Sequence, residues 1–262
     1  MLKWGAGTDL LIGGMVMDLC ITGRHIVIMG GTHGLGEAVA QAALEEGARV
    51  TVTSRQDQPS KRFAVKVLDT ADDKSIAQFV HNWGEQSLDA LFVNTGGPKP
   101  GAVKDLSLQD WDYAWRQVVR GPLAVVRALI PYMVSGGAIV FNTSSSIRSP
   151  IPNLALSNVL RPAVSALAKS LADELAPHQI RVNVIAPGRI ATRRVEELDK
   201  ASANRLGQSE KWIKEQAVSK IPLGRYGDPQ EFGRAAVFLL SPAAGFVTGT
   251  TLLVDGGQTR VL

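Results

Sequence analysis

Short runs of apolar residues alternate along the chain with longer segments in which apolar residues recur every three or four positions. The short runs predict buried strands, and the longer segments predict amphipathic helices. Strands are expected at residues 25–29, 48–53, 63–68, 88–93, 137–142, 180–185 and 250–254. Helices are expected at residues 35–46, 71–83, 106–134, 157–176 and 229–240, the third of them interrupted at Gly121 and Pro122. Strands that alternate with helices predict βαβ units and a parallel sheet.

Two architectures combine this alternation with a length of 262 residues: the β/α barrel and the doubly wound open sheet. No linker rich in Pro, Gly or Ser divides the chain. A glycine-rich turn follows the first predicted strand and opens the first helix, which is where an open nucleotide-binding sheet holds phosphate. We therefore predict an α/β fold with a doubly wound (Rossmann) parallel sheet in a single domain.

Residues 1–16 precede the first predicted strand and lack the charged start, long apolar core and cleavage site of a signal peptide. Met15 and Met17 offer internal start positions. We expect residues 1–16 to be an N-terminal extension without a catalytic role, and residues 17–262 to form the Rossmann domain. The alternative for the extension is an ordered arm at a subunit contact.

Composition excludes several classes of protein. The net charge of +4 is spread over the chain without a basic block, which favours an ordinary surface or an anionic-ligand site over nucleic-acid binding. The single cysteine, Cys20, excludes a disulfide framework and fits a reducing compartment such as the cytoplasm. The four histidines show no metal-ligand spacing, so no metal is expected. The longest apolar run, residues 10–17, is far shorter than the roughly 20 residues that span a bilayer.

The glycine-rich turn reads Gly-Gly-Thr-His-Gly-Leu-Gly over residues 30–36. Glycines permit positive φ angles and close approach of the backbone to a pyrophosphate, and the following helix N-terminus offers free N–H groups. The spacing G-x-x-x-G-x-G differs from G-x-G-x-x-G, and simple turn punctuation is the alternative interpretation. The position between an apolar strand and an amphipathic helix favours dinucleotide binding. The expected ligands in this turn are Gly30, Thr32, His33, Gly34, Leu35 and Gly36.

The end of the second predicted strand bears on the choice of cofactor. A sheet that binds NAD places an acidic residue about 20 residues beyond the glycines, where it binds the ribose 2′-hydroxyl. This chain has Ser54 and Arg55 at that step. A guanidinium suits a 2′-phosphate, so we expect NADP(H) in preference to NAD(H). The alternative for Arg55 is a solvated surface arginine.

Further motifs follow the glycine turn in order. Asn-Thr-Gly-Gly at residues 94–97 follows the fourth predicted strand, Pro187-Gly188 follows the sixth, and Val-Asp-Gly-Gly lies at residues 254–257. Together with the turn, they resemble the short-chain dehydrogenase/reductase family, in particular its 3-oxoacyl-carrier-protein-reductase-like members, over about residues 17–262. The resemblance implies cofactor contacts from Asp69, Thr70, Asn94, Gly96, Pro187, Gly188, Ile190 and Thr192.

The catalytic positions depart from the family pattern. The family uses a Ser, a Tyr, a Lys and a helix Asn, and the resemblance places Ser145, Ser157, Arg161 and Val118 at these positions. A serine hydroxyl is far less acidic than a phenol and an arginine stays protonated, so Ser157 and Arg161 do not reproduce the Tyr–Lys pair. Arg161 can still bind ribose hydroxyls and stabilise an oxyanion, with Ser145 and Ser157 orienting a carbonyl while water donates the proton.

Two functions are compatible with these motifs. The retained cofactor motifs favour an NAD(P)(H)-dependent oxidoreductase that transfers hydride between NADP(H) and a small carbonyl or secondary alcohol substrate. The replaced Tyr, Lys and Asn favour a dinucleotide-binding protein with little turnover, acting as a sensor or in assembly. Residues 191–220 are expected to form a lid, with a solvated amphipathic helix as the alternative. The resemblance implies a homo-oligomer, either a tetramer or a dimer, and neither nucleic acid nor a membrane is an expected partner.

Overall fold

The computed structural model describes residues 17–58 and 60–260, so the predicted extension at residues 1–16 lies outside the described residues. The strands form one parallel sheet in the order β3-β2-β1-β4-β5-β6-β7. Their bounds are His25–Ile28 (β1), Arg49–Ser54 (β2), Ala64–Val67 (β3), Leu88–Val93 (β4), Met133–Asn142 (β5), Arg181–Pro187 (β6) and Thr251–Val254 (β7). Strand β1 pairs with both β2 and β4, so the chain winds outward in both directions from β1. This arrangement confirms the predicted doubly wound fold.

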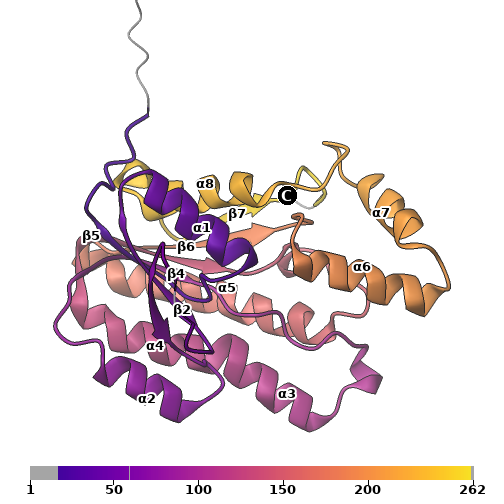
Figure 1. Ribbon diagram of the computed structural model, residues 1–262, viewed down its shortest axis with the longest axis horizontal. Coiled ribbons are helices and arrows are strands. Elements are labelled where there is room, and N and C mark those ends of the chain that lie inside the picture. The colour runs from indigo at the N-terminus through magenta and orange to yellow at the C-terminus, as the bar shows by residue number, and fades with distance from the viewer. Residues whose placement is uncertain (1–16, 59, 261–262) are drawn as a thin grey trace, which may run out of the picture.

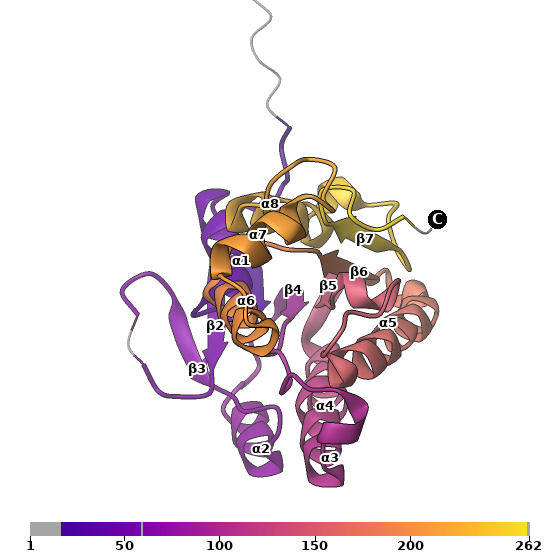
Figure 2. The same ribbon diagram turned by 90° about the vertical axis from the view of Figure 1, so that its right-hand side faces the viewer.

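Helices cover both faces of the sheet (Figures 1 and 2). On one face, α1 and α8 pack against each other, and α2, α3, α4 and α5 cover the other. Helices α6 and α7 follow the C-terminal end of β6 and project beyond the strand ends. The helix bounds are Gly34–Glu45 (α1), Asp73–His81 (α2), Leu108–Trp115 (α3), Gly121–Leu129 (α4), Ala155–Leu175 (α5), Arg193–Leu206 (α6), Glu210–Val218 (α7) and Pro229–Leu240 (α8).

Each face of the sheet has its own apolar core. Under α1 and α8, the rings of Phe92 and Phe232 meet edge to face with centroids 6.4 Å apart. Under the other helices, Trp83 and Phe141 are fully buried. The central strands are therefore buried on both faces, as parallel strands between two helix layers must be.

The segment predicted as one helix at residues 106–134 is built differently. Helix α3 is followed by a π-helical turn, η2 (Arg116–Arg120), then by α4, and β5 begins at Met133. The π turn lies just before Pro122, whose ring would collide with the carbonyl of Val118 in a regular α-helix. A Cβ on Gly121 would lie 1.8 Å from the carbonyl oxygen of Thr70, so the helix can pass this loop only at a glycine. The irregularity lies at the predicted interruption. The prediction that the helix continues to residue 134 was wrong, because α4 ends at Leu129, a 3₁₀ turn that contains Pro131 follows, and the chain enters β5 at Met133.

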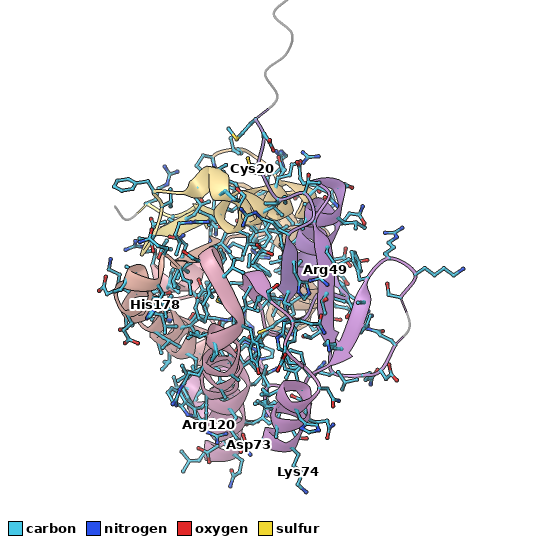
Figure 3. The ribbon with its side chains drawn as sticks, turned by 90° about the vertical axis from the view of Figure 1, so that its left-hand side faces the viewer. Cys20, Arg49, Asp73, Lys74, Arg120 and His178 are labelled. Carbon is cyan, nitrogen blue, oxygen red and sulfur yellow. The ribbon has the colours of Figure 1, made fainter. Side chains whose placement is uncertain are left out.

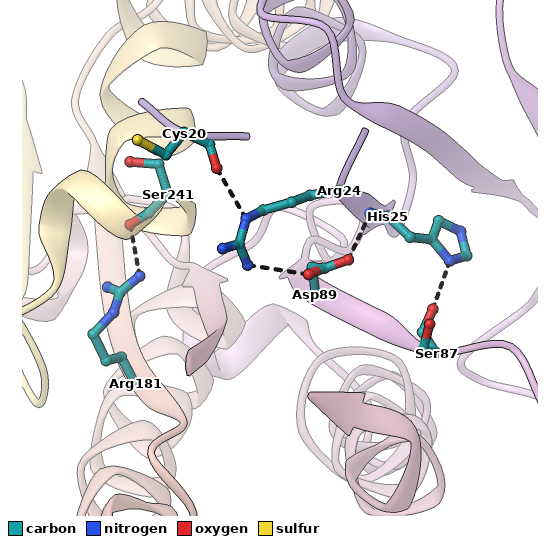
Figure 4. Close-up of polar contacts among 7 residues, drawn as sticks. All are labelled: Cys20, Arg24, His25, Ser87, Asp89, Arg181 and Ser241. Atoms are coloured by element: carbon teal, nitrogen blue, oxygen red, sulfur yellow. Dashed lines mark hydrogen bonds and ion pairs between the residues drawn. The ribbon is translucent and has the colours of Figure 1, made fainter. Parts of the chain in front are cut away.

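Ion pairs and hydrogen bonds join neighbouring elements on the outside of the helix layer and at the N-terminal edge of the sheet. Arg120 Nη1 lies 2.6 Å from Asp73 Oδ1 and joins η2 to α2 (Figure 3). At the N-terminal edge of the sheet, Arg24 binds the side chain of Asp89, which also accepts the amide of His25 (Figure 4). The imidazole of His25 in turn contacts the carbonyl oxygen of Ser87 at 2.9 Å. The polar groups of Arg24, His25 and Asp89 at this edge are therefore paired within the chain.

None of the helices in residues 17–58 and 60–260 is both long enough and apolar enough to cross a membrane. The same residues contain no cluster of three or more His, Cys, Asp or Glu side chains that could hold a metal ion.

Candidate active site

The glycine-rich turn connects β1 to α1 in a conformation that other side chains would prevent. Gly30 and Gly34 have φ angles of +60° and +58°, and a Cβ on Gly36 would lie 2.1 Å from the carbonyl oxygen of Gly30. The turn is held against the end of β2, because the amides of Gly30 and Gly31 donate to the hydroxyl and carbonyl oxygens of Thr53. The result is an open backbone cradle with no side chain projecting from its tightest points.

The start of α1 presents unpaired amides to this cradle. His33 is the N-cap and makes no side-chain capping bond, and its carbonyl accepts the first hydrogen bond of the helix from the amide of Glu37. The amides of the first helical turn, residues 34–36, therefore have no partner within the helix. Thr32 Oγ1 and His33 Nδ1 lie 3.0 Å apart beside them. Free amides and the positive end of a helix dipole fit the pyrophosphate of a dinucleotide.

The end of β2 separates the roles of its two predicted ligands. The hydroxyl of Ser54 is nearly buried and accepts hydrogen bonds from the amide of Gln56 and from Gln58 Nε2. Arg55 is exposed. Thr53 binds the glycine turn, and Arg55 follows Thr53 by two residues. The side chain of Arg55 is therefore free to reach a ligand that lies on the turn. Ser54 instead shapes the loop that follows.

Asp69 and Thr70, at the end of β3, are committed to holding their own loop. One carboxylate oxygen of Asp69 accepts the amide of Ala71 at 2.9 Å. The hydroxyl of Thr70 donates to the carbonyl oxygen of Gln117 in the π turn, again at 2.9 Å. These side chains fix the position of the β3–α2 connection, so any contact with a cofactor here uses the remaining carboxylate oxygen or the backbone.

A chain of polar contacts crosses the C-terminal ends of the central strands. Asn94 Nδ2 donates to the carbonyl oxygen of Gly30, and Asn94 Oδ1 accepts from Asn142 Nδ2 at 2.8 Å. Arg161 donates from Nη1 to the carbonyl oxygen of Asn142 at 2.9 Å and from Nη2 to that of Thr95 at 3.5 Å. The chain joins the glycine turn to β4, β5 and α5. Neither Thr95 nor Asn142 was predicted as a site residue from the sequence. The signal that marks both is a polar residue at or just past the end of a strand.

Arg161 is the most unusual member of this chain. It is 5% exposed, and burial lowers the pKa of its guanidinium to about 10. Within the part of the chain that the structure describes, no carboxylate lies within 4.0 Å of it. The side chain is therefore a buried cation at neutral pH with two carbonyl oxygens as partners, which is costly unless a further acceptor completes the shell.

The three predicted catalytic residues come together. Ser145 opens the short 3₁₀ helix η4 (Ser145–Ile147), which packs against α5. Ser157 lies in the first turn of α5, and Arg161 follows one turn later on the same face. Each serine is 9% exposed. The structure thus places two hydroxyls and one guanidinium on neighbouring surfaces at the end of β5.

Val118 stands at the helix position that the family resemblance assigns to asparagine, so this position carries no polar side chain. Val118 is 1% exposed and belongs to the apolar core beneath the π turn. The preceding residue, Gln117, is also buried, and its Nε2 lies 3.5 Å from where a Cβ on Gly96 would be. Gln117 therefore brings an amide to the end of β4. No local sequence signal marks Gln117, because its position depends on the π turn beside Pro122.

The connection from β6 to α6 folds back over the glycine turn. Pro187 ends β6, the amide of Gly188 donates to the carbonyl oxygen of Val254, and a Cβ on Gly188 would meet Asp255 at 2.6 Å. Ile190 is buried at 3% exposure. The methyl of Thr192, the N-cap of α6, lies 4.0 Å from where a Cβ on Gly34 would be. Of the predicted ligands at the end of β6, the structure thus places Thr192 beside the glycine turn, whereas Gly188 packs against Asp255 and Ile190 belongs to the apolar core.

The base of α6 is anchored by a three-membered polar cluster. Arg189 forms an ion pair with Asp199, which also accepts the phenol hydrogen bond of Tyr226 at 2.8 Å. Burial, with the hydrogen bond to Asp199, raises the pKa of Tyr226 to about 12. A phenol held in this way is a poor proton donor to a substrate, so Tyr226 serves packing.

Comparisons with known proteins extend over nearly the whole chain. The family model described as "Enoyl-(Acyl carrier protein) reductase" matches residues 30–259. Human "Dehydrogenase/reductase SDR family member 4" is 30% identical, with 93% of this chain and 90% of that protein covered. "3-oxoacyl-[acyl-carrier-protein] reductase FabG" of Chlamydia pneumoniae is 27% identical, covering 93% and 100%. A crystal structure of L-sorbose reductase from Gluconobacter frateurii, complexed with NADPH and L-sorbose, superimposes with a TM-score of 0.84 at 28% identity, covering 94% and 100%.

Proposed function

The chain belongs to the short-chain dehydrogenase/reductase family, and on that premise we propose that it is an oxidoreductase that transfers hydride between NADP(H) and a carbonyl or secondary alcohol. The observation that carries the proposal is the glycine cradle with the unpaired amides of residues 34–36 at the start of α1. That cradle fits a dinucleotide pyrophosphate and leads directly to the Asn94–Asn142–Arg161 chain.

NADP(H) is proposed in preference to NAD(H) because of Arg55. It is exposed just after β2, two residues beyond Thr53, which anchors the glycine turn, and β2 supplies no carboxylate there for a ribose 2′-hydroxyl. A 2′-phosphate would complete a charge-assisted contact with its guanidinium. The NADPH complex of the sorbose reductase supports the same assignment by similarity.

The residues present define a mechanism without a tyrosine. The nicotinamide, when bound, supplies or accepts the hydride. Ser145 and Ser157 would each offer an Oγ–H hydrogen bond to the substrate oxygen and so orient it toward the cofactor side of the cleft. Arg161 would keep its proton and stabilise negative charge on that oxygen, using N–H groups that the two carbonyl contacts leave free. The proton itself would come from water through a serine hydroxyl, since neither hydroxyl nor guanidinium is a matched acid.

Helices α6 and α7, within residues 191–220, are proposed as the lid over the substrate side. The methyl of Thr192 lies 4.0 Å from where a Cβ on Gly34 would be, and Arg194 Nη2 donates to the carbonyl oxygen of Pro98 beyond β4. The segment therefore bridges the strand ends where a substrate would enter. By similarity to the family, we also propose a homo-oligomer in the cytoplasm.

A second function, dinucleotide binding with little turnover, is favoured by one specific observation. Val118 is sealed in the apolar core and Ser157 is too short to replace a phenol, so the site lacks an efficient proton donor. General acid catalysis typically contributes 10²–10⁴-fold in rate, and its loss would leave a slow enzyme or a sensor.

The two functions are separated by measuring NADPH binding and NADPH oxidation on the same preparation. A panel of β-ketoacyl esters, ketones and quinones is expected to include a substrate whose reduction oxidises NADPH. Ser145→Ala is expected to lower kcat by about 10- to 100-fold while leaving NADPH affinity unchanged, because one hydrogen bond to the substrate oxygen is removed. Micromolar NADPH binding without turnover on the whole panel would instead support the sensor.

A further inference from the structure

Three connections border the substrate side of the cleft, and their charges are all of one sign. They follow β4 (residues 94–101), β5 (residues 143–154) and β6 (residues 188–194). These ranges contain no Asp or Glu and carry Lys99, Arg148, Arg189, Arg193 and Arg194, the last two being the first residues of α6. The next acids along the chain are Asp105 after the first range and Glu196 after the last. Parallel strands place such connections at one edge of a sheet, so these charges share one region.

Most of these cations are neutralised from outside the three connections. Lys99 pairs with Asp110, Arg189 with Asp199, and Arg193 with Glu197. Asp255, which packs on Gly188 from the β7 side, is already satisfied because it accepts the amides of Gly257 and Thr259. The acids near the cleft are therefore committed to other partners.

Arg194 has no carboxylate within 4.0 Å among the residues that the structure describes. It is half-buried at the second position of α6, where the helix dipole opposes a cation. Its guanidinium donates to the carbonyl oxygen of Pro98 at 2.9 Å, and its Nε lies 3.1 Å from where a Cβ on Gly97 would be. The charge is thus held over the end of β4 by a single carbonyl oxygen.

The loop beneath Arg194 is hydrogen-bonded to the neighbouring connection. The amide of Gly101 donates to the carbonyl oxygen of Asn153, and the amide of Ala155 donates to the carbonyl oxygen of Gly101. These bonds tie the β4 connection to the β5 connection. Arg148 also has no carboxylate within 4.0 Å among the described residues, but its side chain is exposed to solvent. Arg161 is a buried cation without such a partner; it lies at the ends of the same two strands and uses two of its five N–H donors. Two guanidinium groups with free donors therefore serve one cleft.

We propose that the substrate carries an anionic group, a carboxylate or a phosphate, close to its reacting carbonyl, and that Arg194 binds this group while Arg161 adds its field from beneath. The inference rests on the proposed function, because it assigns the substrate side of the same cleft. A planar guanidinium binds either oxyanion through two parallel hydrogen bonds, which an uncharged ketone or ester does not offer.

Isothermal titration calorimetry on the protein saturated with NADP⁺ tests the proposal without turnover, because the oxidised cofactor cannot reduce a ketone. Acetoacetate is compared with methyl acetoacetate, and hydroxyacetone phosphate with hydroxyacetone. One anion is expected to bind about tenfold or more tightly than its neutral counterpart, as a charged hydrogen bond in a cleft gives. Which of the two anions shows the preference distinguishes carboxylate from phosphate. With NADP⁺ occupying the glycine turn, neither anion can bind there instead.

Arg194→Gln is expected to abolish the preference for the anion and to leave NADP⁺ affinity unchanged. Arg205→Gln removes an exposed arginine from the last turn of the same helix and is the matched control, for which the preference is retained. Equal affinity for anion and neutral counterpart, or an Arg194→Gln protein that binds the anion as tightly as the wild type, would overturn the proposal. Failure of the proposed function is seen separately, as absent NADP⁺ binding or absent NADPH oxidation. In that case, comparing anion binding by the free wild-type protein and by free Arg194→Gln still decides the role of Arg194.

Discussion

The two edges of the sheet treat buried polar groups in opposite ways. At the N-terminal edge, Arg181 is 8% exposed and donates to three carbonyl oxygens, those of Leu239, Ser241 and Val247, at 2.8–3.3 Å. Figure 4 shows the bond to Ser241. At the C-terminal edge, Arg161 is equally buried but has two acceptors, one of them at 3.5 Å. Neither arginine has a carboxylate within 4.0 Å among the described residues. Two buried cations of the same type thus differ in how completely the chain surrounds them.

The same difference holds for uncharged groups. Four buried side-chain oxygens lack a partner among the described residues: Thr95 Oγ1, Asn142 Oδ1, Ser146 Oγ and Gln258 Oε1. All four lie at or just beyond the C-terminal ends of β4, β5 and β7. Native proteins rarely leave such atoms unpaired, so their concentration at one edge indicates that a ligand belongs there. Buried polar groups whose hydrogen bonds are all made within the chain support folding. Buried polar groups that lack a partner within the chain lie at the candidate site.

The largest effect is expected where the polar shell is complete. Arg181→Met leaves three buried carbonyl oxygens without a donor, so the free energy of unfolding should fall by about 3 kcal/mol. Urea unfolding followed by circular dichroism measures this loss. NADPH affinity of the folded fraction should be unchanged. A variant as stable as the wild type would contradict the claim that the hydrogen bonds of Arg181 support folding.

The next largest effect is expected in the glycine cradle. Gly36→Ala places a methyl about 2 Å from the carbonyl oxygen of Gly30, so the turn must shift and NADPH affinity should fall by about 100-fold. Fluorescence titration with NADPH gives the affinity. Gly84→Ala is the control, since Gly84 also has a positive φ but open space around it, and it should bind NADPH normally. Normal binding by the Gly36 variant would exclude the cradle as the phosphate site.

A smaller effect is expected from Arg55, which is exposed at the rim of the site. Arg55→Asp replaces a partner for the 2′-phosphate by one for the 2′-hydroxyl, and the ratio of NADPH to NADH affinity should fall by about tenfold or more. Titration with both cofactors checks this change. Arg62→Asp, another exposed arginine, on the far side of the β2–β3 connection, should leave the ratio as it is. A ratio that Arg55→Asp does not alter would assign Arg55 to the solvated surface.

The smallest effect is expected from titration of the N-terminal edge. Burial is the main cause that lowers the pKa of His25 below its usual 6.5, so the folded protein favours the neutral imidazole. Stability from this group is fully present above pH 6.5 and is lost as the pH falls from 6.5 through the lower pKa of the folded state. The urea midpoint should therefore decrease over this range, and His25→Gln should reduce the decrease. Identical pH profiles of the two proteins would contradict a neutral His25.

Sequence patterns predicted most of the fold because the relevant signals are local. Strand β1, the glycine turn and α1 are consecutive, and each shows its own period or its glycines. The π turn at η2 escaped prediction because it depends on Pro122 together with the contact of Gly121 on Thr70, which is about 50 residues away in sequence. Periodicity alone cannot encode such a contact.

The site was predicted in part for the same reason. Ser145, Ser157 and Arg161 were predicted from the family resemblance, and the structure packs η4, which holds Ser145, against α5, which holds the other two. Asn142 and Gln117 were missed, because a polar residue in a strand or helix shows its role only when the fold places it at the cleft. The partners of Arg161 likewise arise from two separate strand ends.

The most direct test of the account compares Arg161→Met with Arg181→Met in thermal unfolding, each with and without saturating NADPH. The account predicts that Arg161→Met costs less than about 1 kcal/mol without cofactor, because it removes an incompletely paired buried charge, and that it loses most of the stabilisation by NADPH. Arg181→Met should be unstable in both conditions and keep that stabilisation. The account is contradicted if Arg161→Met unfolds as readily as Arg181→Met without NADPH and still gains the full stabilisation from it.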